Sequence, residues 1–429
     1  MKSNEIIVGV DIGTTKIAVI IGRKDEKGNI EILGSGKTDS IGVMRGSVIN
    51  IEKTAESIRF AVEEAETKSN VKVAEVYVGI AGQHIKSIQQ RGSLIRSSNE
   101  EEISLHDIYT LKENMYKLVM KPGEEIVDVI PQEYIIDYEP GIKQPIGISG
   151  TCLEANFHII TGQISAIKNI VRSVKKAGLE VKDLILEPLA SAEAVLDEKE
   201  KEAGVCLVDI GGGTTDVAIF QDGIIRHTAV IPLGGNIITE DVKEGCTIIK
   251  SQAEALKVKF GSALASENKA EEIIAIPGLR GRPAKEISKN NLANIIQARM
   301  EEIIEHVLYE IKNSGYEKKL ITGIVITGGG AMLKHVNLLT EYITGMDTRI
   351  GYPSEHLSPN SPEELANPIY ATGVGLVIKG FERMEAEYER LPKDPGGNNI
   401  KKPKPPKPPT SGGGGLIPWI KKLLEEDVK

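Results

Sequence analysis

The sequence contains the same strand–turn–strand pattern twice, at positions far apart in the chain. The first copy is VGVDIGTTKIAVIIG at residues 8–22, and the second is VDIGGGTTDVAIF at residues 208–220. In each copy an apolar run carries an aspartate just before a glycine turn, and two threonines lead into a second apolar run. Glycine permits positive φ and lets a ligand approach the backbone, whose N–H groups can then face an anion. One copy is compatible with an ordinary β-hairpin, but two copies predict related half-domains that share a ligand.

The order of the predicted elements repeats as well. Around the first copy, periodicity predicts three strands, a helix and a fourth strand, at residues 6–11, 16–22, 30–37, 51–65 and 74–80. Around the second copy it predicts three strands and the start of a helix, at residues 205–209, 214–220, 224–231 and from about 237. We therefore predict an α/β fold made of two duplicated domains.

The remaining apolar patterns complete this prediction. Helices are expected at residues 164–176, from Leu189, at 249–260 and at 288–313, and buried strands at 181–187 and 321–327. A segment with four prolines between the first helix and residue 163 indicates a small inserted subdomain. The predicted boundaries are 1–84 with 163–200 for the first half, 85–162 for its insertion, 201–234 with 320–385 for the second half, and 235–319 for the second insertion.

The C-terminal part of the sequence changes character. Residues 386–414 include KKPKPPKPP and a glycine run, a composition that predicts an extended linker. In the tail at residues 415–429, apolar side chains recur at helical spacing beside an aromatic one that suits a membrane interface: Leu416, Ile417, Ile420, Leu423, Leu424 and Trp419. The tail is expected to form an amphipathic helix on an anionic membrane surface. The alternative is a helix that packs back onto the protein.

Composition excludes several classes of function. A formal net charge of −9 argues against broad nucleic-acid binding, because such binding needs a basic surface. The three cysteines are widely spaced and no two histidines stand at HxxH or HxxxH spacing, which disfavours a disulfide framework or a zinc site. We expect a cytoplasmic protein without a signal peptide or a membrane-spanning segment.

Three glycine-rich turns carry the candidate chemistry, at residues 13–15, 211–215 and 328–330. None fits the P-loop pattern or the dinucleotide-binding fingerprint. The backbone N–H groups and threonine hydroxyls of the first two turns can hold phosphate oxygens from opposite sides. Asp11 and Asp209 each precede one of these turns, where a carboxylate can hold a hydrated Mg²⁺ beside the phosphates. The third turn has room for a sugar or base, so we predict a nucleotide clamped between the two halves.

Five motifs of the sequence resemble those of a known superfamily. VGVDIGTTKI is similar to the first phosphate motif of the actin–Hsp70–sugar kinase superfamily and VDIGGGTTDVAIF to its second. LEPLASAEAVL (186–196) and YATGVGL (370–376) resemble its two connecting motifs, and IVITGGGAML resembles its adenosine motif. Within the superfamily the resemblance is closest to the FtsA family of bacterial cell-division proteins. DIGTTKIAV, the place of the first insertion, AEALKVKFG (253–261) and the linker with its tail carry that resemblance.

The resemblance implies a fold, cofactors and a site. The fold is a pair of actin-like, ribonuclease H-like domains around a nucleotide cleft, with two inserted subdomains, and the cofactors are ATP and Mg²⁺. Residues of the first half that would contact phosphates and metal are Asp11, Gly13, Thr14, Thr15 and Lys16. Their counterparts in the second half are Asp209, Gly211, Gly212, Gly213, Thr214 and Thr215. The adenosine side would be formed by Gly235, Glu254, Lys257, Gly328, Gly329, Gly330 and Met332.

Three of these implied roles have an alternative. Glu187 either positions an attacking water or ends a strand before Pro188. Glu254 and Lys257 share one helical face, where they either contact the ribose and adenine or form a surface ion pair. Arg299 and Glu302 stand where FtsA relatives receive the C-terminal peptide of the tubulin-like protein FtsZ, although charges on the outer face of an amphipathic helix are commonly just solvated.

The function implied is that of an ATP-binding, actin-like cell-division protein. It would assemble head to tail on the cytoplasmic side of the cell membrane at the division site, tether FtsZ filaments there, and contact later cell-division proteins. It would hydrolyse ATP slowly at most. The alternatives are a small-molecule kinase, a chaperone ATPase, and a scaffold similar to the pilus-assembly protein PilM. The expected membrane-binding tail is the feature that distinguishes the cell-division protein from these three alternatives.

Overall fold

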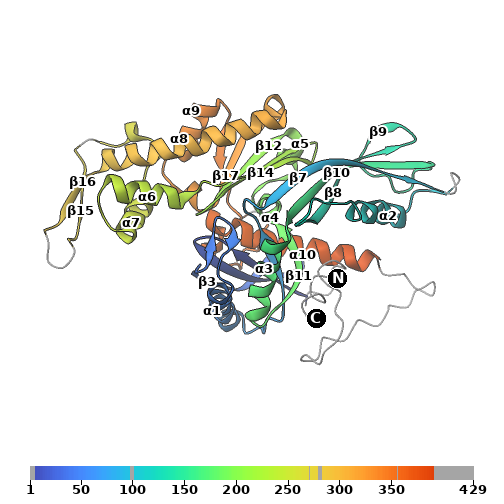
Figure 1. Ribbon diagram of the computed structural model, residues 1–429, viewed down its shortest axis with the longest axis horizontal. Coiled ribbons are helices and arrows are strands. Elements are labelled where there is room, and N and C mark those ends of the chain that lie inside the picture. Colours follow the sequence, from blue (N-terminus) through green and yellow to red (C-terminus); the bar gives the residue numbers. More distant parts are fainter. Residues whose placement is uncertain (1–4, 97–100, 270, 279–282, 355, 391–429) are drawn as a thin grey trace.

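The computed structural model describes residues 5–96, 101–269, 271–278, 283–354 and 356–390, and its two five-stranded sheets share one topology (Figure 1). The first sheet has the order β11-β6-β1-β2-β3 and the second the order β14-β13-β12-β17-β18. In each sheet three consecutive strands are antiparallel, and the first of the three also pairs in parallel with a later strand. The predicted duplicated α/β fold is confirmed.

The first half contains the first sheet and four helices. Its strands are β1 (Ile6–Ile12), β2 (Lys16–Lys24), β3 (Ile30–Asp39), β6 (Glu75–Ile80) and β11 (Glu180–Leu186), with a small ribbon of β4 (Val43–Met44) and β5 (Ser47–Val48). Its helices are α1 (Ile51–Ser69), α3 (Ile164–Lys176), α4 (Glu187–Val195) and α5 (Glu198–Ala203).

Local sequence explains why α1 begins and ends where it does. The Asn50 side chain accepts a hydrogen bond from the Lys53 N–H at the start of the helix, and Asn70 adopts the left-handed conformation at its end. The apolar face of α1 is buried against β3, where a Cβ at Gly36 would lie 1.9 Å from the Ala61 carbonyl oxygen. Only glycine at this position lets helix and sheet approach so closely.

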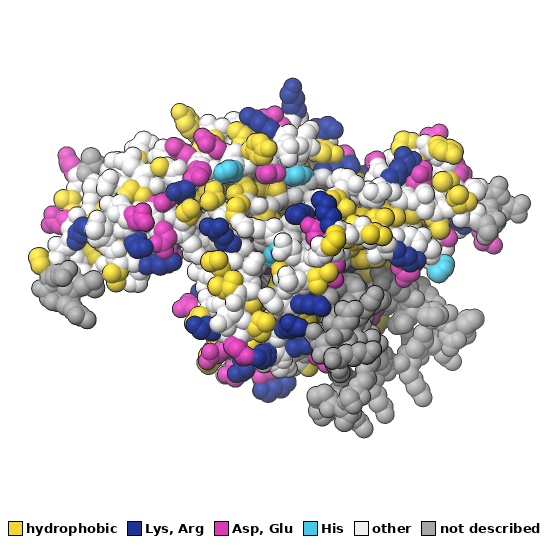
Figure 2. Space-filling model, in the orientation of Figure 1, with side chains coloured by type: hydrophobic (Ala, Val, Ile, Leu, Met, Phe, Trp, Pro, Cys, Tyr) yellow, Lys and Arg dark blue, Asp and Glu magenta, His cyan; other side chains and the backbone are white. Residues whose placement is uncertain are grey.

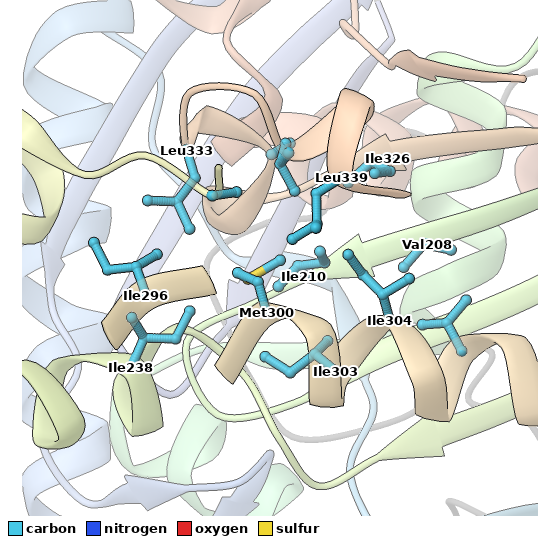
Figure 3. Packing of buried hydrophobic residues seen from close by; sticks show 14 of the residues in the cluster. Val208, Ile210, Ile238, Ile296, Met300, Ile303, Ile304, Ile326, Leu333 and Leu339 are labelled. Atoms are coloured by element: carbon cyan, nitrogen blue, oxygen red, sulfur yellow. The ribbon is translucent and has the colours of Figure 1, made fainter. Parts of the chain in front are cut away.

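The second half contains the second sheet, and a large apolar core lies beside it. The strands are β12 (Val205–Ile210), β13 (Thr215–Gln221), β14 (Ile224–Ile231), β17 (Ile324–Thr327) and β18 (Thr348–Ile350). The other elements are α6 (Gly235–Gly245), α7 (Lys250–Phe260), α8 (Lys289–Ser314), α9 (Val336–Thr344) and the hairpin of β15 (Ile273–Ile276) and β16 (Lys285–Ser288). Figure 3 shows Met300 and Ile304 of α8 pointing toward Ile210 of β12, and all three are buried.

The first insertion is a separate sheet that also touches the second half. It consists of β7 (Ile85–Ile95), β8 (Glu124–Ile136), β9 (Glu139–Ile142), β10 (Cys152–Gln163) and α2 (Leu105–Tyr116), with its own apolar core. The Gln89 and Gln132 side chains donate hydrogen bonds to the Arg226 and Ile225 carbonyls of β14, at 3.2 and 2.5 Å. The insertion therefore covers the edge strand of the second sheet, and it extends from there to one end of the molecule (Figure 1).

The two halves are joined by α4 and the C-terminal helix α10 (Ala371–Arg390). The two helices touch at a glycine, because a Cβ at Gly375 would lie 1.8 Å from the Ala190 carbonyl oxygen. Apolar side chains of both helices pack in one cluster with β2 of the first half and β13 of the second. This cluster is the hydrophobic contact between the halves.

The structure corrects three predicted boundaries. The strand predicted at 181–187 ends at Leu186, because Glu187 and Pro188 begin α4. The strand predicted at 321–327 begins only at Ile324, after the positive-φ Gly323. After β17, the third glycine turn leads into a short 3₁₀ helix, η4 (Gly329–Met332), and α9 follows it. Helix α10 continues past residue 385 to Arg390, into the range predicted as linker.

The C-terminal tail and most of the linker lie outside the described residues. The predictions for Leu416, Ile417, Trp419, Ile420, Leu423 and Leu424 therefore remain predictions of the sequence. In the part of the chain that the structure describes, no helix combines the length and apolar character needed to cross a bilayer.

A buried charge cluster connects the insertion to α10. The guanidinium of Arg383 contacts the Asp128 carboxylate of β8, and its Nε lies 3.6 Å from the Asp183 carboxylate of β11. Burial raises the pKa of Asp128, but Arg383 and Lys112 outweigh it and hold that pKa well below its usual range. Burial raises the pKa of Asp183 to about 6. Arg383 is thus the cation on which both buried carboxylates depend.

We expect Arg383→Met to lower the free energy of unfolding by about 3 kcal/mol, because the substitution leaves Asp128 buried without its main partner. The matched control is Arg23→Met, since Arg23 pairs with Glu31 at 2.7 Å but is 41% exposed. The control should lose much less stability, because the Arg23 ion pair is exposed to solvent and such pairs contribute little. Urea unfolding measures both values, and equal losses in the two variants would contradict the expectation.

Candidate functional site

The two copies of the repeated motif bring their aspartates to equivalent strand ends. Asp11 lies near the end of β1 and Asp209 near the end of β12, and both are buried. The Asp11 carboxylate forms an ion pair with Lys16 of the same hairpin, at 2.7 Å. Burial lowers the pKa of Lys16, but Asp11 and the other nearby carboxylates outweigh it and raise that pKa above its usual value. Lys16, predicted to contact phosphate, is therefore charged and already at the site.

Asp209 is held in a different way. Its Oδ2 accepts hydrogen bonds from the hydroxyl groups of Ser191 on α4, at 2.7 Å, and Thr372 on α10, at 3.3 Å. Among the described residues, no lysine or arginine forms an ion pair with Asp209. Sequence reasoning missed both hydroxyl residues, although each lies in a connecting motif quoted above.

A third buried aspartate was also missed. Asp216 of β13 stands directly opposite Asp209 in the antiparallel pair, and it belongs to the second copy of the motif itself. One oxygen accepts a 3.4 Å hydrogen bond from the Thr214 hydroxyl, while Oδ1 is buried without a partner. Burial and the charge of Asp209 raise the pKa of Asp216 well above its usual value.

Glu187 completes the cluster at the start of α4. Burial raises its pKa well above the usual value, and the charges of Asp11, Asp216 and Asp209 add to the effect. Four carboxylates thus face one lysine, an imbalance that a bound cation would relieve. No three His, Cys, Asp or Glu side chains within the described ranges are grouped closely enough to hold a bare metal ion. The arrangement fits a cation bound through water, as the sequence predicts for Asp11 and Asp209.

The first two glycine turns face each other in direct contact. A Cβ at Gly212 would lie 1.9 Å from the Thr15 Oγ1, and one at Gly213 would lie 2.5 Å from the Thr14 Oγ1. The Thr15 hydroxyl also donates a long hydrogen bond to the Asn236 side chain, at 3.4 Å. The absence of side chains on the second turn is therefore what allows the threonines of the first turn to approach it.

The third turn packs on the second one. Gly328 has a φ of +81°, and a Cβ there would lie 2.2 Å from Asp209 Oδ1. A Cβ at Gly330 would collide with Ile210 at 2.3 Å. At Gly329 the nearest atom would be 4.0 Å away, and Met332 at the end of η4 is 51% exposed. One face of this turn is thus open, as a flat ligand group requires.

The remaining predicted adenosine residues come together at the start of α6. Lys257 of α7 donates to the Gly235 carbonyl and to the Thr239 hydroxyl, both at 2.8 Å, and forms an ion pair with Glu254 at 2.8 Å. The Lys257 side chain is 11% exposed and that of Glu254 is 42% exposed. The pair is therefore more than a surface ion pair, because it fixes the start of α6 beside the second glycine turn.

The residues at this site fit the nucleotide and Mg²⁺ that the sequence predicts. The glycine turns place bare backbone beside the threonine hydroxyls. An unpartnered buried carboxylate oxygen and three further carboxylates can receive a hydrated cation, and Lys16 offers positive charge to an anion. Asp11, Gly13, Thr14, Thr15 and Lys16 would hold the phosphates from one side and Asp209 with residues 211–215 from the other. An open glycine face beside Met332 would accept a planar base. This is the donor set expected for a nucleoside polyphosphate with its metal ion.

The predicted partner-binding residues lie elsewhere, on α8. Arg299 pairs with both carboxylate oxygens of Asp241 on α6, through Nε at 2.6 Å and Nη2 at 3.1 Å, and also contacts Glu302 one turn along its own helix. Its side chain is 24% exposed. Arg299 and Glu302 are thus neighbours on a partly exposed face, which leaves the assignment to a partner peptide a prediction.

Three family models match parts of the chain. The model described as cell division protein FtsA matches residues 206–375, and the SHS2 domain inserted in FtsA matches residues 82–161, which include all but the last two residues of the insertion sheet. A model of Hsp70 protein matches residues 165–230.

Solved structures under 25% identical show the fold. PilM, from a structure of the PilM–PilN type IV pilus biogenesis complex, matches with a TM-score of 0.64 and 15% identity, covering 87% of this chain and 98% of PilM. MreB5 of Spiroplasma citri bound to ADP matches with a TM-score of 0.50 and 15% identity, covering 90% of this chain and 98% of MreB5. Both similarities support the actin-like fold.

Curated relatives match at higher identity. The chain is 39% identical to the cell division protein FtsA of Pseudomonas aeruginosa over 383 residues, covering 89% of this chain and 91% of the relative. It is 36% identical to the FtsA of Neisseria meningitidis serogroup B over 417 residues, covering 97% of each. It is 35% identical to the FtsA of Bacillus subtilis, covering 88% of this chain and 84% of the relative. With this identity along nearly the whole of both sequences, the chain belongs to the FtsA family of cell-division proteins.

Proposed function

We propose that this cell-division protein binds ATP with Mg²⁺ between its two halves, assembles on the cytoplasmic side of the cell membrane at the division site, and tethers FtsZ filaments there. The observation that carries the nucleotide site is the pair of equivalent aspartate–glycine turns, which meet around a cluster of carboxylates that lacks sufficient positive charge. MreB5, which shares this fold, has a solved structure bound to ADP, and this supports the proposal that the present chain binds an adenine nucleotide.

Binding between the turns requires a local movement. The Thr14 and Thr15 side chains contact Gly213 and Gly212 directly, so phosphates that enter between the turns displace these hydroxyls. Mg²⁺, held through water beside Asp11 and Asp209, would offset the negative charge of both the phosphates and the carboxylates. Binding should release protons from carboxyl groups whose pKa is raised, because the cation favours their ionised form.

The first expected outcome concerns nucleotide binding. ATP with Mg²⁺ at about a hundred times its dissociation constant should stabilise the protein by roughly 2.7 kcal/mol and raise its unfolding temperature. Gly329→Val should remove most of this shift, since Gly329 has space for a side chain and the variant is expected to fold. Differential scanning fluorimetry measures the effect.

Tyr342→Val is the matched control, because Tyr342 is an 84% exposed residue of α9 that follows the third turn in the chain. It should retain the full shift. An unchanged unfolding temperature of the parent protein with Mg²⁺ and ATP would contradict nucleotide binding.

Hydrolysis is expected to be slow. Glu187 is the carboxylate that the family resemblance implies for positioning water, and positioning of water by one carboxylate supplies only a modest part of a rate enhancement. We expect steady-state turnover below about one per second, against a median of about ten per second for enzymes. Glu187→Ala should lower turnover further while retaining the ATP-dependent stabilisation. Turnover much faster than a few per second would favour a true enzyme such as a kinase.

Assembly and membrane binding are linked. A head-to-tail contact between unlike surfaces does not close, so it produces filaments. The insertion carries exposed apolar side chains at Ile95, Val119 and Tyr138, and Figure 2 shows hydrophobic side chains on that end of the molecule. One tail would bind a membrane weakly, but a filament that presents many tails would bind well. PilM shares the fold, and a membrane-binding tail separates this proposal from a PilM-like scaffold.

The tail should act as the membrane anchor. Full-length protein with ATP is expected to float with vesicles of anionic lipid, to form filaments visible on them by electron microscopy, and to carry FtsZ with it. A chain ending at Gly415, or one with Trp419→Glu and Leu423→Glu, should stay in the soluble fraction because its apolar face is lost. Equal flotation of these variants would mean that the anchor lies elsewhere.

A variant on α8 separates membrane binding from FtsZ binding. Arg299→Ala should float as well as the parent but carry about tenfold less FtsZ, the loss expected when a charged hydrogen-bonding group is removed. Arg23→Ala, in the first half, is the matched control and should carry the normal amount. If Arg299→Ala recruits FtsZ normally, the peptide binds at another surface.

A further inference from the structure

Three buried oxygen-bearing side chains meet where the two halves join. The Ser191 and Thr372 hydroxyls both reach Asp209 Oδ2, at 2.7 and 3.3 Å, and the two hydroxyl oxygens lie 3.0 Å apart. Ser191 is fully buried, and Asp209 and Thr372 are each 8% exposed. We propose that Ser191 and Thr372 are positioning residues that hold the Asp209 carboxylate for the cation and connect it to both joining helices. The proposal rests on the proposed function, since the cation is that of the bound nucleotide.

The way in which the two equivalent aspartates are held supports this role. Asp11 is paired with the charged Lys16, which neutralises it. Asp209 is held by neutral hydroxyl groups, which fix its orientation but leave its negative charge available. Its other oxygen, Oδ1, lies so close to the third turn that a Cβ at Gly328 would come within 2.2 Å of it. The carboxylate is therefore held by hydrogen bonds at one oxygen and confined by the third turn at the other, and among the described residues no lysine or arginine forms an ion pair with it.

The helices that supply the hydroxyls are the elements through which the halves could move. Helix α4 follows β11 of the first half, yet it packs against β12 and β13 of the second. Helix α10 follows the second half in the chain, yet it packs against β1, where a Cβ at Gly9 would lie 2.9 Å from the Leu376 Cβ. The two helices cross at Gly375 and Ala190, next to the hydroxyl residues. A change in the angle between the halves therefore acts on this crossing and on the hydrogen bonds to Asp209.

The geometry predicts a reciprocal coupling between cation binding and helix packing. A cation that engages Asp209 favours the arrangement in which both hydroxyls reach it. A movement of α4 against α10 that breaks these hydrogen bonds lets the carboxylate turn and weakens cation binding. The factor by which it weakens cation binding equals the factor by which the bound cation favours the intact hydrogen bonds. The alternative is that the two hydroxyls only satisfy the hydrogen-bonding needs of buried Asp209. They would then stabilise the fold, but the Mg²⁺ concentration needed to raise the unfolding temperature would not depend on them.

The test measures thermal unfolding with ATP over a series of Mg²⁺ concentrations. In Ser191→Ala, Thr372→Val and the double variant, the Mg²⁺ concentration for half of the maximal shift should rise, by about tenfold in the double variant, the loss expected when hydrogen bonds to a charged group are removed. The shift with ATP in the presence of a chelator should stay as in the parent. Thr372→Ser keeps the hydroxyl and should restore the parent value.

Thr340→Val is the matched control, because the Thr340 hydroxyl is equally buried but bonds only to the Val336 carbonyl of its own helix. Hydrogen exchange provides a second readout: Mg²⁺ with ATP should protect both α4 and α10 in the parent and fail to do so in the double variant. Variants that unfold at lower temperature with an unchanged Mg²⁺ dependence would overturn the proposal and leave a structural role. A parent protein without any ATP effect would instead refute the proposed nucleotide site.

Discussion

The structure depends on an excess of negative charge at the place where its two halves meet. Asp11, Asp209, Asp216 and Glu187 come from equivalent strands and from a joining helix, and Lys16 is the cation that accompanies them. Burial raises the pKa of three of the four carboxyl groups, which reflects the cost of placing like charges together in a poorly solvated site. Groups with such perturbed pKa values cluster at functional sites. A cation that binds here with its anion would relieve the repulsion between the carboxylates, and this relief would contribute to its affinity.

Glycine makes this arrangement possible in two ways. At the turns, Gly212, Gly213 and Gly328 bring the backbone of the second half against the threonines of the first and against Asp209. At the joint, Gly375 lets α10 lie directly on the backbone of α4, and Gly9 leaves room on β1 for the Leu376 side chain of α10. The same lack of side chains that lets a ligand approach the backbone also lets the halves approach each other. Ligand binding and the contact between the halves are therefore governed by the same residues.

The insertion adds a third connection. Its β7 and β8 donate side-chain hydrogen bonds to the edge strand β14, and its Asp128 depends on Arg383 of α10. It thus contacts the second half directly and the joining helix through a buried charge. The exposed apolar residues at its far end belong to the surface on which head-to-tail assembly is proposed. Helix α10 thus contacts both Asp209, at the proposed nucleotide site, and Asp128 of the insertion.

Local sequence determined the elements and the motifs. Alternation and helical periodicity located the duplicated strands and helices, because each strand or helix carries its own burial pattern. The turns around Asp11 and Asp209 were visible because each aspartate, its glycine or glycines and the two threonines lie within a few residues of one another in the chain. The predicted hairpin also contains Asp216, whose place opposite Asp209 follows from the register of its two strands. Only the tertiary structure decided which distant groups meet: Ser191 and Thr372 on the same oxygen of Asp209, and Arg383 beside Asp128 and Asp183. These partners lie on separate elements, so no local pattern records them, and their placement follows from how the two sheets, the insertion and the joining helices pack.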